Sequence, residues 1–141
     1  MPLEPTEKKI TGDLGEDIAT KFLINKGFTV IERNYRKKFG EIDIVAKKDT
    51  VVHFVEVKTV SRENLKDVPD ETKDISNSPE DCFRPEDNIH PWKQKRLSRA
   101  IQVYISENRL EKIDWQFDAV TVLLDVKNRI ARVKILEDII L

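Results

Sequence analysis

The sequence predicts an α/β fold in which a mixed central sheet is flanked by helices. Two observations predict this class. Segments with helical and strand periodicity follow one another in the order helix, three strands, helix, two strands. One of these strands, residues 51–60, is apolar enough to be buried on both faces in the middle of a sheet. A chain of 141 residues can bury one full core, so residues 1–141 are expected to form a single domain.

The first helix is predicted to follow a polar N-terminal stretch. Residues 1–11 are polar, carry two prolines and are expected to be frayed. Apolar side chains then recur every three or four residues, which predicts an amphipathic helix over 13–26. Gly27 is a natural C-terminal stop for this helix.

Three strands are predicted after the first helix. β-branched and aromatic residues predict strands over 28–32 and 42–46, separated by a loop or strand end over 34–40. The polar turn over 47–50 predicts that the third strand, 51–60, pairs with the second strand as a hairpin.

The second half of the chain is predicted to contain a long loop, a helix and two strands. Residues 61–88 are acidic and polar with three prolines, which predicts a long, partly disordered loop. Pro91 suits the first turn of a second helix that extends to about Glu107. The last two strands are predicted over 115–124 and 129–136.

Composition argues against several classes of protein. No apolar run approaches the ~18 residues that a membrane-spanning helix needs, so no membrane association is expected. The N-terminus has no basic region followed by an apolar one and does not resemble a signal peptide. The single cysteine, Cys82, cannot form an internal disulfide, and a cytoplasmic location is therefore predicted.

Basic residues are clustered although the chain as a whole is not basic. The formal net charge is -1, whereas phosphate binding usually leaves a basic footprint. The local clusters could still form a basic face. The candidates for contacts with nucleic acid are Arg33, Arg36, Lys95 and Arg96, and an ordinary solvated surface position is the alternative for each.

Glu56 and Lys58 are charged residues within the otherwise apolar third strand. Residues i and i+2 of a strand point to the same face, so these two side chains project side by side. Charges are rarely buried without a partner or a function. If the second and third strands form a hairpin, Asp43 lies across from the Glu56 region, and two carboxylates and one ammonium group converge.

The second strand is expected to alternate in the same way. Glu41 and Asp43 would share one face, with Glu41 as a second candidate for the same pocket, while Ile42 and Ile44 would share the other face. Close carboxylates repel each other unless one is protonated or a cation lies between them. Hard oxygen ligands favour Mg²⁺ or Mn²⁺. The alternative is a structural ion pair at a sheet edge, which a central third strand disfavours.

Asp43, followed by Glu56 and Lys58 on the next strand, resembles the PD-(D/E)xK motif of the restriction-endonuclease-like superfamily. Ile42 stands where the name of the motif has proline. The predicted order of elements also resembles the αβββαβ core of that superfamily, which therefore implies a restriction-endonuclease-like fold.

A closer resemblance, over nearly the whole chain, is to the YraN family of small bacterial proteins. Six pieces carry this resemblance in order: residues 15–19, 33–36, 40–45, 54–59, 95–97 and 117–120. Two features depart from the family pattern: the insertion over 61–88 is longer than usual, and Thr59 stands where a basic residue often follows the lysine. Archaeal Holliday-junction resolvases are similar in their core, and their acidic residue on the first helix corresponds to Glu16.

The resemblance implies a role for each residue of the site. Asp43 and Glu56 would bind the metal ion, with the Val57 carbonyl as a further ligand, and Glu16 would hold a second ion or a metal-bound water. The metal would polarise the scissile phosphate and activate the attacking water, while Lys58 would orient that water and offset the developing charge.

These features together predict a metal-dependent endonuclease that acts on branched, damaged or single-stranded DNA. The alternative is a nuclease-fold module that binds nucleic acid or a protein partner without cutting, and an RNA nuclease is a weaker alternative. A homodimer would most easily cut both strands of a duplex. His53, expected on the strand face opposite Glu56, and Asp118 are interpreted as structural residues.

Overall fold

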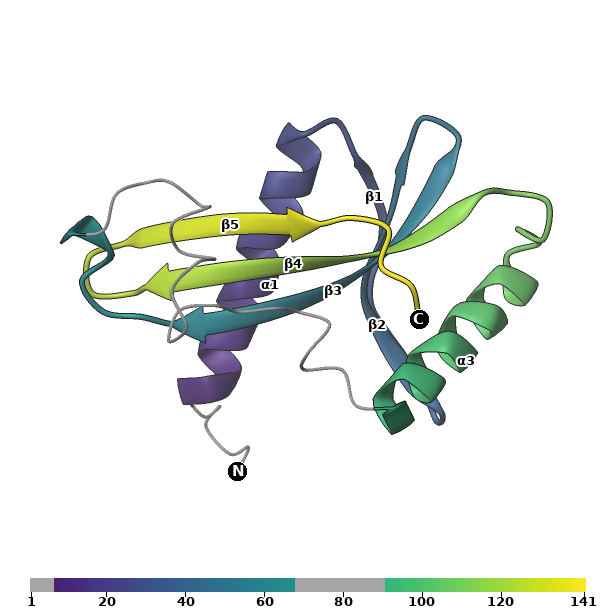
Figure 1. Cartoon of the computed structure of the whole chain (residues 1–141), viewed down its shortest axis with the longest axis horizontal. Coiled ribbons are helices and arrows are strands. Elements are labelled where there is room, and N and C mark those ends of the chain that lie inside the picture. The colour runs from purple at the N-terminus through teal and green to yellow at the C-terminus, as the bar shows by residue number, and fades with distance from the viewer. Residues whose placement is uncertain (1–6, 68–90) are drawn as a thin grey trace, which may run out of the picture.

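The computed structural model describes residues 7–67 and 91–141 and confirms the predicted α/β fold (Figure 1). Helices and strands follow one another in the predicted order, with a short 3-10 helix, η1, after the third strand. The elements are α1 (Glu7–Asn25), β1 (Thr29–Lys37), β2 (Gly40–Lys48), β3 (Val51–Ser61), η1 (Leu65–Asp67), α3 (Pro91–Glu107), β4 (Trp115–Asp125) and β5 (Ile130–Leu136).

The strands of the described residues form one sheet in the order β1-β2-β3-β4-β5, so β3 lies at its centre as predicted. β3 and β4 are parallel and every other neighbouring pair is antiparallel, which makes the sheet mixed. α1 packs on one face, chiefly against β3 and β4, and α3 packs on the other face against β2 (Figure 1). The two helices therefore cover opposite faces of the sheet.

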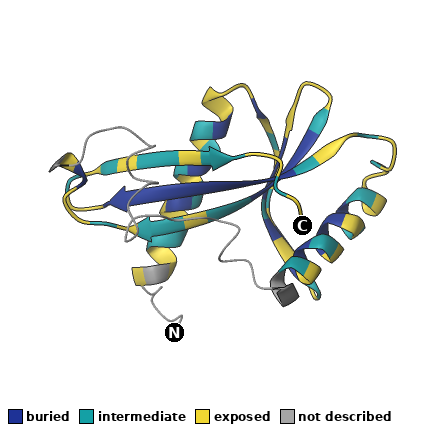
Figure 2. Ribbon diagram, viewed as in Figure 1, coloured by how far each residue is buried: buried dark blue, intermediate teal, exposed yellow. Residues whose placement is uncertain are grey.

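Two apolar clusters hold the helices on the sheet. The α1-side core includes Ala19, Leu23, Phe28, Ile44, Val55 and Val120. The α3-side core includes Tyr35, Ile42, Val45, Phe54, Ile101 and Tyr104. β4 is buried along nearly its whole length (Figure 2), whereas β3 is buried on both faces only over residues 52–55. The second half of β3 is therefore partly open to solvent.

α1 begins earlier than predicted and α3 has the predicted bounds. α1 starts at Glu7, so the prediction of a frayed segment is wrong for residues 7–11. Gly12 lies inside the helix, and no atom lies within 4 Å of the place that a side chain would take there. Gly27 follows the helix with a φ of 95°, the left-handed conformation expected of a C-terminal stop. No helix within the described residues is both long and apolar enough to cross a membrane.

β1 runs through the segment that was predicted to be a loop or strand end. Asn34 has a φ of 54°, yet β1 keeps its pairing with β2, and Tyr35 lies opposite Ile42. The Tyr35 side chain is buried in the α3-side core and its ring contacts that of Tyr104 edge to face. Tertiary packing therefore extends the strand beyond its local sequence signal.

The loop prediction for residues 61–88 is wrong for its first residues. Ser61 ends β3, and Leu65 in η1 is completely buried. The Leu65 N–H donates to Asp125 Oδ2 at 3.1 Å, and its carbonyl accepts from Arg132 Nη2 at 2.8 Å. These bonds fix η1 against the turn between β4 and β5. Residues 68–88 of the predicted loop lie outside the described residues.

β2 and β3 separate at the position of the candidate site. Their pairing runs from Lys48 opposite Val51 to Ile44 opposite Val55 and stops there. Beyond it, β2 pairs only with β1, while β3 continues beside β4 (Figure 1). Ile42 belongs to the α3-side core but Ile44 to the α1-side core, so the prediction that these two share a face is wrong. Simple alternation is not maintained where β2 leaves its partner.

Candidate functional site

Asp43 lies where β2 and β3 separate, and its side chain reaches the main chain of β3. Its Oδ2 accepts a hydrogen bond from the Val57 N–H at 2.8 Å. This N–H lies just beyond the part of β3 that pairs with β2, so the carboxylate takes the place of a strand partner. The bond places Asp43 beside the backbone that connects Glu56 to Lys58.

Close packing of α1 on β3 brings Glu16 to the same place. A side chain at Gly15 would overlap the side chain of Thr59, so only glycine allows this approach of helix to strand. Glu16 follows Gly15 directly, and it lines one groove together with Asp43, Val57 and Thr59. Residues of α1 that precede its predicted start, such as Lys9 and Thr11, also line this groove. We call it the Asp43 groove.

The electrostatics of the groove disfavour an ionised Asp43. Burial raises the pKa of the Asp43 carboxyl to about 7. The hydrogen bond from Val57 lowers this pKa, whereas the negative charges of Glu16, Glu56 and Glu41 raise it further. Burial also raises the pKa of Glu16, against the charge of Arg33. Two neighbouring acids are therefore both held in surroundings that oppose their charge.

Glu56 and Lys58 share one face of β3, whereas Asp43 lines the groove on the α1 side. β3 pairs with β4 without a break from Val52 to Ser61, so its side chains alternate regularly. Phe54 belongs to the α3-side core, which puts Glu56 and Lys58 on the α3 side. Glu56 is half-buried and Lys58 is exposed. The groove on the α1 side and the Glu-x-Lys pair therefore lie on opposite faces of β3, although the charge of Glu56 still acts on Asp43.

The predicted basic residues divide between two surfaces. Arg33 and Arg36 border a groove that also has Glu16 in its wall and so adjoins the Asp43 groove. Arg33 Nη2 pairs with Asp17 at 2.9 Å, while its buried Nε has no hydrogen-bond partner within the described residues. Lys95 lines a different surface on α3, and Arg96 Nε donates to the Phe39 carbonyl at 3.2 Å. Lys95 and Arg96 therefore do not border the Asp43 groove.

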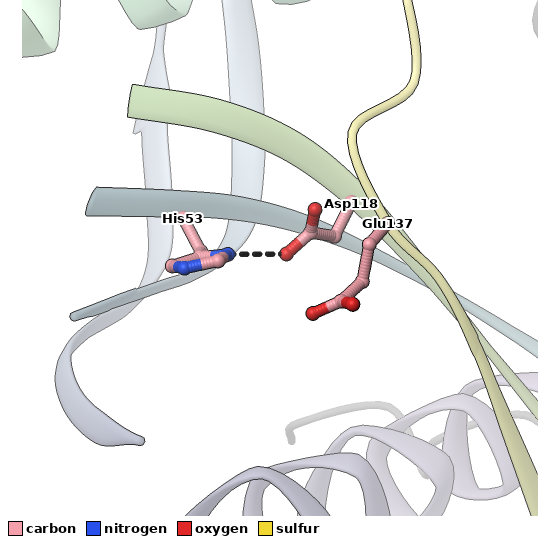
Figure 3. A group of neighbouring side chains, drawn as sticks. All are labelled: His53, Asp118 and Glu137. Atoms are coloured by element: carbon pink, nitrogen blue, oxygen red, sulfur yellow. Dashed lines mark hydrogen bonds and ion pairs between the residues drawn. The ribbon is translucent and has the colours of Figure 1, made fainter. Parts of the chain in front are cut away.

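Within the described part of the chain, potential metal ligands lie close together at another place. The potential ligand atoms of His53, Asp118 and Glu137 all lie within 4.8 Å of one another (Figure 3). The carboxylates of Glu16, Asp43 and Glu56 do not form such a group in the residues that the structure describes. Sequence reasoning identified His53 and Asp118 only as structural residues and missed Glu137, since nothing in the local pattern after a strand end indicates which neighbour it meets.

Comparison with models of known families shows which protein family the chain belongs to. The model of a family described as "Uncharacterised protein family UPF0102" matches residues 15–122, which is more than half of the chain. The chain belongs to the UPF0102 family. This finding confirms the family resemblance expected from the six sequence pieces, whereas the wider relationship to restriction-endonuclease-like proteins remains an expectation.

Two other UPF0102 proteins match over most of their length, and a third matches over a shorter stretch at higher identity. The UPF0102 protein of Dictyoglomus turgidum is 35% identical over 122 residues, which cover 86% of this chain and 89% of that relative. The UPF0102 protein of Chloroherpeton thalassium is 38% identical over 128 residues, covering 91% of this chain and 86% of the relative. A UPF0102 protein of Campylobacter fetus is 56% identical over 52 residues, 37% of this chain and 46% of the relative.

The segment that matches UPF0102 contains the four residues that the sequence predicted to be catalytic. Glu16, Asp43, Glu56 and Lys58 all lie within residues 15–122, whereas Glu137 lies beyond them. The UPF0102 match therefore covers these four residues and part of the groove, but only part of the group of His53, Asp118 and Glu137.

Proposed function

We propose that this protein is a metal-dependent endonuclease that hydrolyses phosphodiester bonds of DNA, with branched or single-stranded DNA as the expected substrate. The observation that carries the proposal is the surroundings of Asp43. Its pKa is raised to about 7 by burial, and Glu16, Glu56 and Glu41 add to the rise. Such an arrangement is unfavourable without a cation, and strongly perturbed acids in a groove are typical of functional sites.

The residues present fit a hard divalent cation. Asp43 and Glu56 supply carboxylate oxygens on either side of the Val57 main chain, and the Val57 carbonyl is a further oxygen of the kind that Mg²⁺ or Mn²⁺ prefers. A bound ion would lower the pKa of a water molecule and polarise a phosphate oxygen. We assign Glu16, across the groove on α1, to the orientation of water, and its raised pKa suits exchange of a proton near neutral pH.

The cationic residues would bind and orient the substrate. Lys58 is exposed and projects beside Glu56, so its ammonium group can donate hydrogen bonds to a phosphate and offset the charge that develops there. Arg33 and Arg36 border the adjoining groove and suit the phosphate that neighbours the scissile one. Lys95 and Arg96 would contact a longer substrate only, because they lie on another surface.

One observation favours a second candidate function. Glu16, Asp43 and Glu56 are not closed around one point within the described residues, as they would be in a preformed metal site. A module that binds nucleic acid or a protein partner without cutting would not need this closure. Substrate and ion together would have to draw the three carboxylates together in an active enzyme.

A cleavage assay with matched variants separates the two functions. The purified chain is incubated with labelled duplex, single-stranded, flap and four-way-junction DNA, and with single-stranded RNA, in Mg²⁺, in Mn²⁺ and in chelator. The variant is Asp43→Asn, which removes the charge but retains an oxygen for the Val57 N–H. The control is Asp49→Asn at the β2–β3 turn, where a φ of 55° suits asparagine as well as aspartate.

Three outcomes are informative. Metal-dependent cleavage that is lost in Asp43→Asn and retained in Asp49→Asn would support the endonuclease. Binding of a substrate without cleavage, in either metal, would favour the non-cutting module. Equal cleavage by both variants would show that Asp43 is not the centre of the site.

A further inference from the structure

A second group of potential ligands joins three segments of the chain on the α1 side of the sheet. His53 comes from β3, Asp118 from β4, and Glu137 is the first residue after β5. Figure 3 shows the His53 ring and the Asp118 carboxylate pointing toward each other, with the Glu137 carboxylate beside Asp118. Val57 is four residues further along β3 than His53, about 13 Å away. The group is therefore separate from the Asp43 groove.

The two inner members of the group are deeply buried and firmly held. Asp118 is completely buried and His53 is 6% exposed. Asp118 Oδ1 accepts hydrogen bonds from Gln116 Nε2 at 2.8 Å and from the Asp138 N–H at 2.9 Å. Its Oδ2 lies 2.6 Å from His53 Nδ1. One oxygen of Asp118 is thus anchored by the protein, while the other is presented to the histidine.

The anchor on Asp118 also fixes the position of Glu137. The main chain after β5 is tied to β4 twice, by the Asp138 N–H to Asp118 and by the Ile139 N–H to the Phe117 carbonyl at 2.7 Å. Glu137 immediately precedes this tether, and its carboxylate is held near Asp118 although it is exposed to solvent. In the described residues, neither carboxylate forms an ion pair with a lysine or an arginine.

A buried aspartate–histidine hydrogen bond explains only part of this arrangement. It accounts for the contact between His53 and Asp118, but it gives no reason for a second carboxylate at the same point. Two neighbouring carboxylates repel each other unless a cation lies between them. An imidazole nitrogen with two carboxylate oxygens is a donor set that suits Zn²⁺ and similar first-row cations better than Mg²⁺ or Ca²⁺.

We propose that His53, Asp118 and Glu137 form a binding site for a divalent first-row transition metal of the Zn²⁺ class, distinct from the Asp43 groove. The ion takes the position between Nδ1 and Oδ2 that the shared hydrogen occupies, and a neutral His53 then carries its proton on Nε2. Metal–ligand distances near 2.1 Å require the 2.6 Å contact to widen to about 3.0–3.4 Å. The hydrogen bonds to Asp118 Oδ1 act as the outer support that such ligands usually have.

The bound ion would add a link between parts of the fold that main-chain hydrogen bonds already join. It bridges the two parallel central strands and the chain that follows β5. Its role is therefore structural, and it fixes the C-terminal segment to the sheet.

The test measures Zn²⁺ binding to the full chain by titration calorimetry after treatment with chelator. All proteins carry Asp43→Asn, so the Asp43 groove does not contribute and the result is independent of the proposed nuclease function. The variant is Glu137→Gln, which changes an exposed residue and leaves the buried pair intact. The matched control is Asp138→Asn, which removes the same charge one residue away and keeps the N–H that Asp118 accepts from. At this position a φ of 56° is compatible with asparagine.

We expect one equivalent of Zn²⁺ to bind, with an affinity at least ~10-fold lower in Glu137→Gln and unchanged in Asp138→Asn. The Nδ1 signal of His53 in nitrogen-15 NMR should shift on binding, and Mg²⁺ should not reproduce this shift. The proposal is overturned if no saturable binding is found, if Glu137→Gln binds as tightly as Asp138→Asn, or if His53 does not respond. In each of these cases the pair of His53 and Asp118 is a structural hydrogen bond only.

Discussion

Asp43 and Asp125 are both shielded carboxylates on strands of one sheet, yet their surroundings are opposite. Asp125 Oδ2 accepts from the Leu65 N–H at 3.1 Å and from Asn128 Nδ2 at 2.8 Å, and its Oδ1 accepts from the Asn128 N–H at 3.1 Å. These hydrogen bonds, with the Asn128 side chain first, lower the pKa of Asp125. Among the described residues, Asp43 has one such bond, from Val57, and burial with three neighbouring acids raises its pKa to about 7.

The ionised form of Asp125 therefore stabilises the fold, whereas the fold disfavours the ionised form of Asp43. Asp125 is surrounded by donors and holds η1 against the β4–β5 turn. Asp43 lies where two strands separate, so few main-chain donors are available and the nearest charges have the same sign. A protein retains such a group when something else, such as a cation, compensates its charge. The predictions below test this division, beginning with the largest effect.

The largest expected effect is on cleavage. It should be seen when Lys58 is changed but not when Asn128, the partner of Asp125, is changed. Lys58→Ala should reduce metal-dependent cleavage at least ~100-fold with little change in melting temperature, because an exposed cation that offsets developing charge adds little to packing. Asn128→Ala should lower the melting temperature and leave the cleavage rate unchanged, since it removes a hydrogen bond to Asp125. Rates and melting curves of the two variants check this. A lysine variant with the wild-type rate would remove Lys58 from the site.

The next effect tests how α1 is held beside Asp43. Gly15→Ala should destabilise the protein by about 1–3 kcal/mol, because the new methyl group overlaps the Thr59 side chain and pushes α1 away. Gly12→Ala in the same helix has open space and should stabilise it by ~0.5–1 kcal/mol through helix propensity. Denaturant unfolding of both variants measures the difference. Equal effects of the two would mean that close packing on Thr59 does not hold α1.

The pH dependence of stability should have opposite signs at the two aspartates. The folded pKa of Asp43 is raised, so its ionisation disfavours folding, increasingly between about pH 4 and 7. Without metal, Asp43→Asn should therefore stabilise the protein by ~1 kcal/mol at pH 8, a melting increase of ~3–5 °C, and the gain should vanish near pH 4. The folded pKa of Asp125 is lowered, so its stabilisation is present at neutral pH and lost as pH falls through that pKa.

Melting curves of Asp43→Asn and Asp125→Asn at pH 8 and pH 4 test these signs. Asp125→Asn should lower the melting temperature at pH 8 and less so at acidic pH. If Asp43→Asn melts well below wild type in chelator at pH 8, Asp43 is a structural residue like Asp125.

The smallest effect is expected from the acidic insertion. Its start is held by Leu65, but residues 69–86 are polar and carry three prolines. Replacing 69–86 by a glycine–serine linker of about ten residues should change stability by less than ~1 kcal/mol, because closure entropy depends weakly on loop length. Calorimetric melting measures this change. A shortened chain that does not fold would show that the insertion packs on the domain.

Local sequence patterns predicted most of the elements but not how they meet. Pro91 correctly indicated the start of α3, and the apolar run around Phe54 predicted a central β3. Alternation put Glu56 and Lys58 on one face correctly, because β3 stays paired with β4. The same rule was wrong for Ile42 and Ile44, since a pattern of residues does not show where a strand leaves its partner.

Long-range contacts account for what the sequence did not reveal. The burial of Leu65 depends on acceptors and donors some 60 residues away, and the position of Glu137 depends on a hydrogen bond from its neighbour to β4. The proximity of Glu16 to Asp43 required the approach of Gly15 to Thr59, although the family resemblance had already indicated Glu16.

The most direct test of the central claim is a Mg²⁺ titration followed by amide NMR. The Val57 N–H donates to Asp43 and the Leu65 N–H donates to Asp125, so each amide reports on one of the two carboxylates. We predict that the Val57 signal shifts saturably with Mg²⁺ in the wild-type chain, that Leu65 does not, and that Asp43→Asn abolishes the Val57 shift. A Val57 signal that Mg²⁺ leaves unchanged, or that moves equally in Asp43→Asn, would contradict a metal site at Asp43.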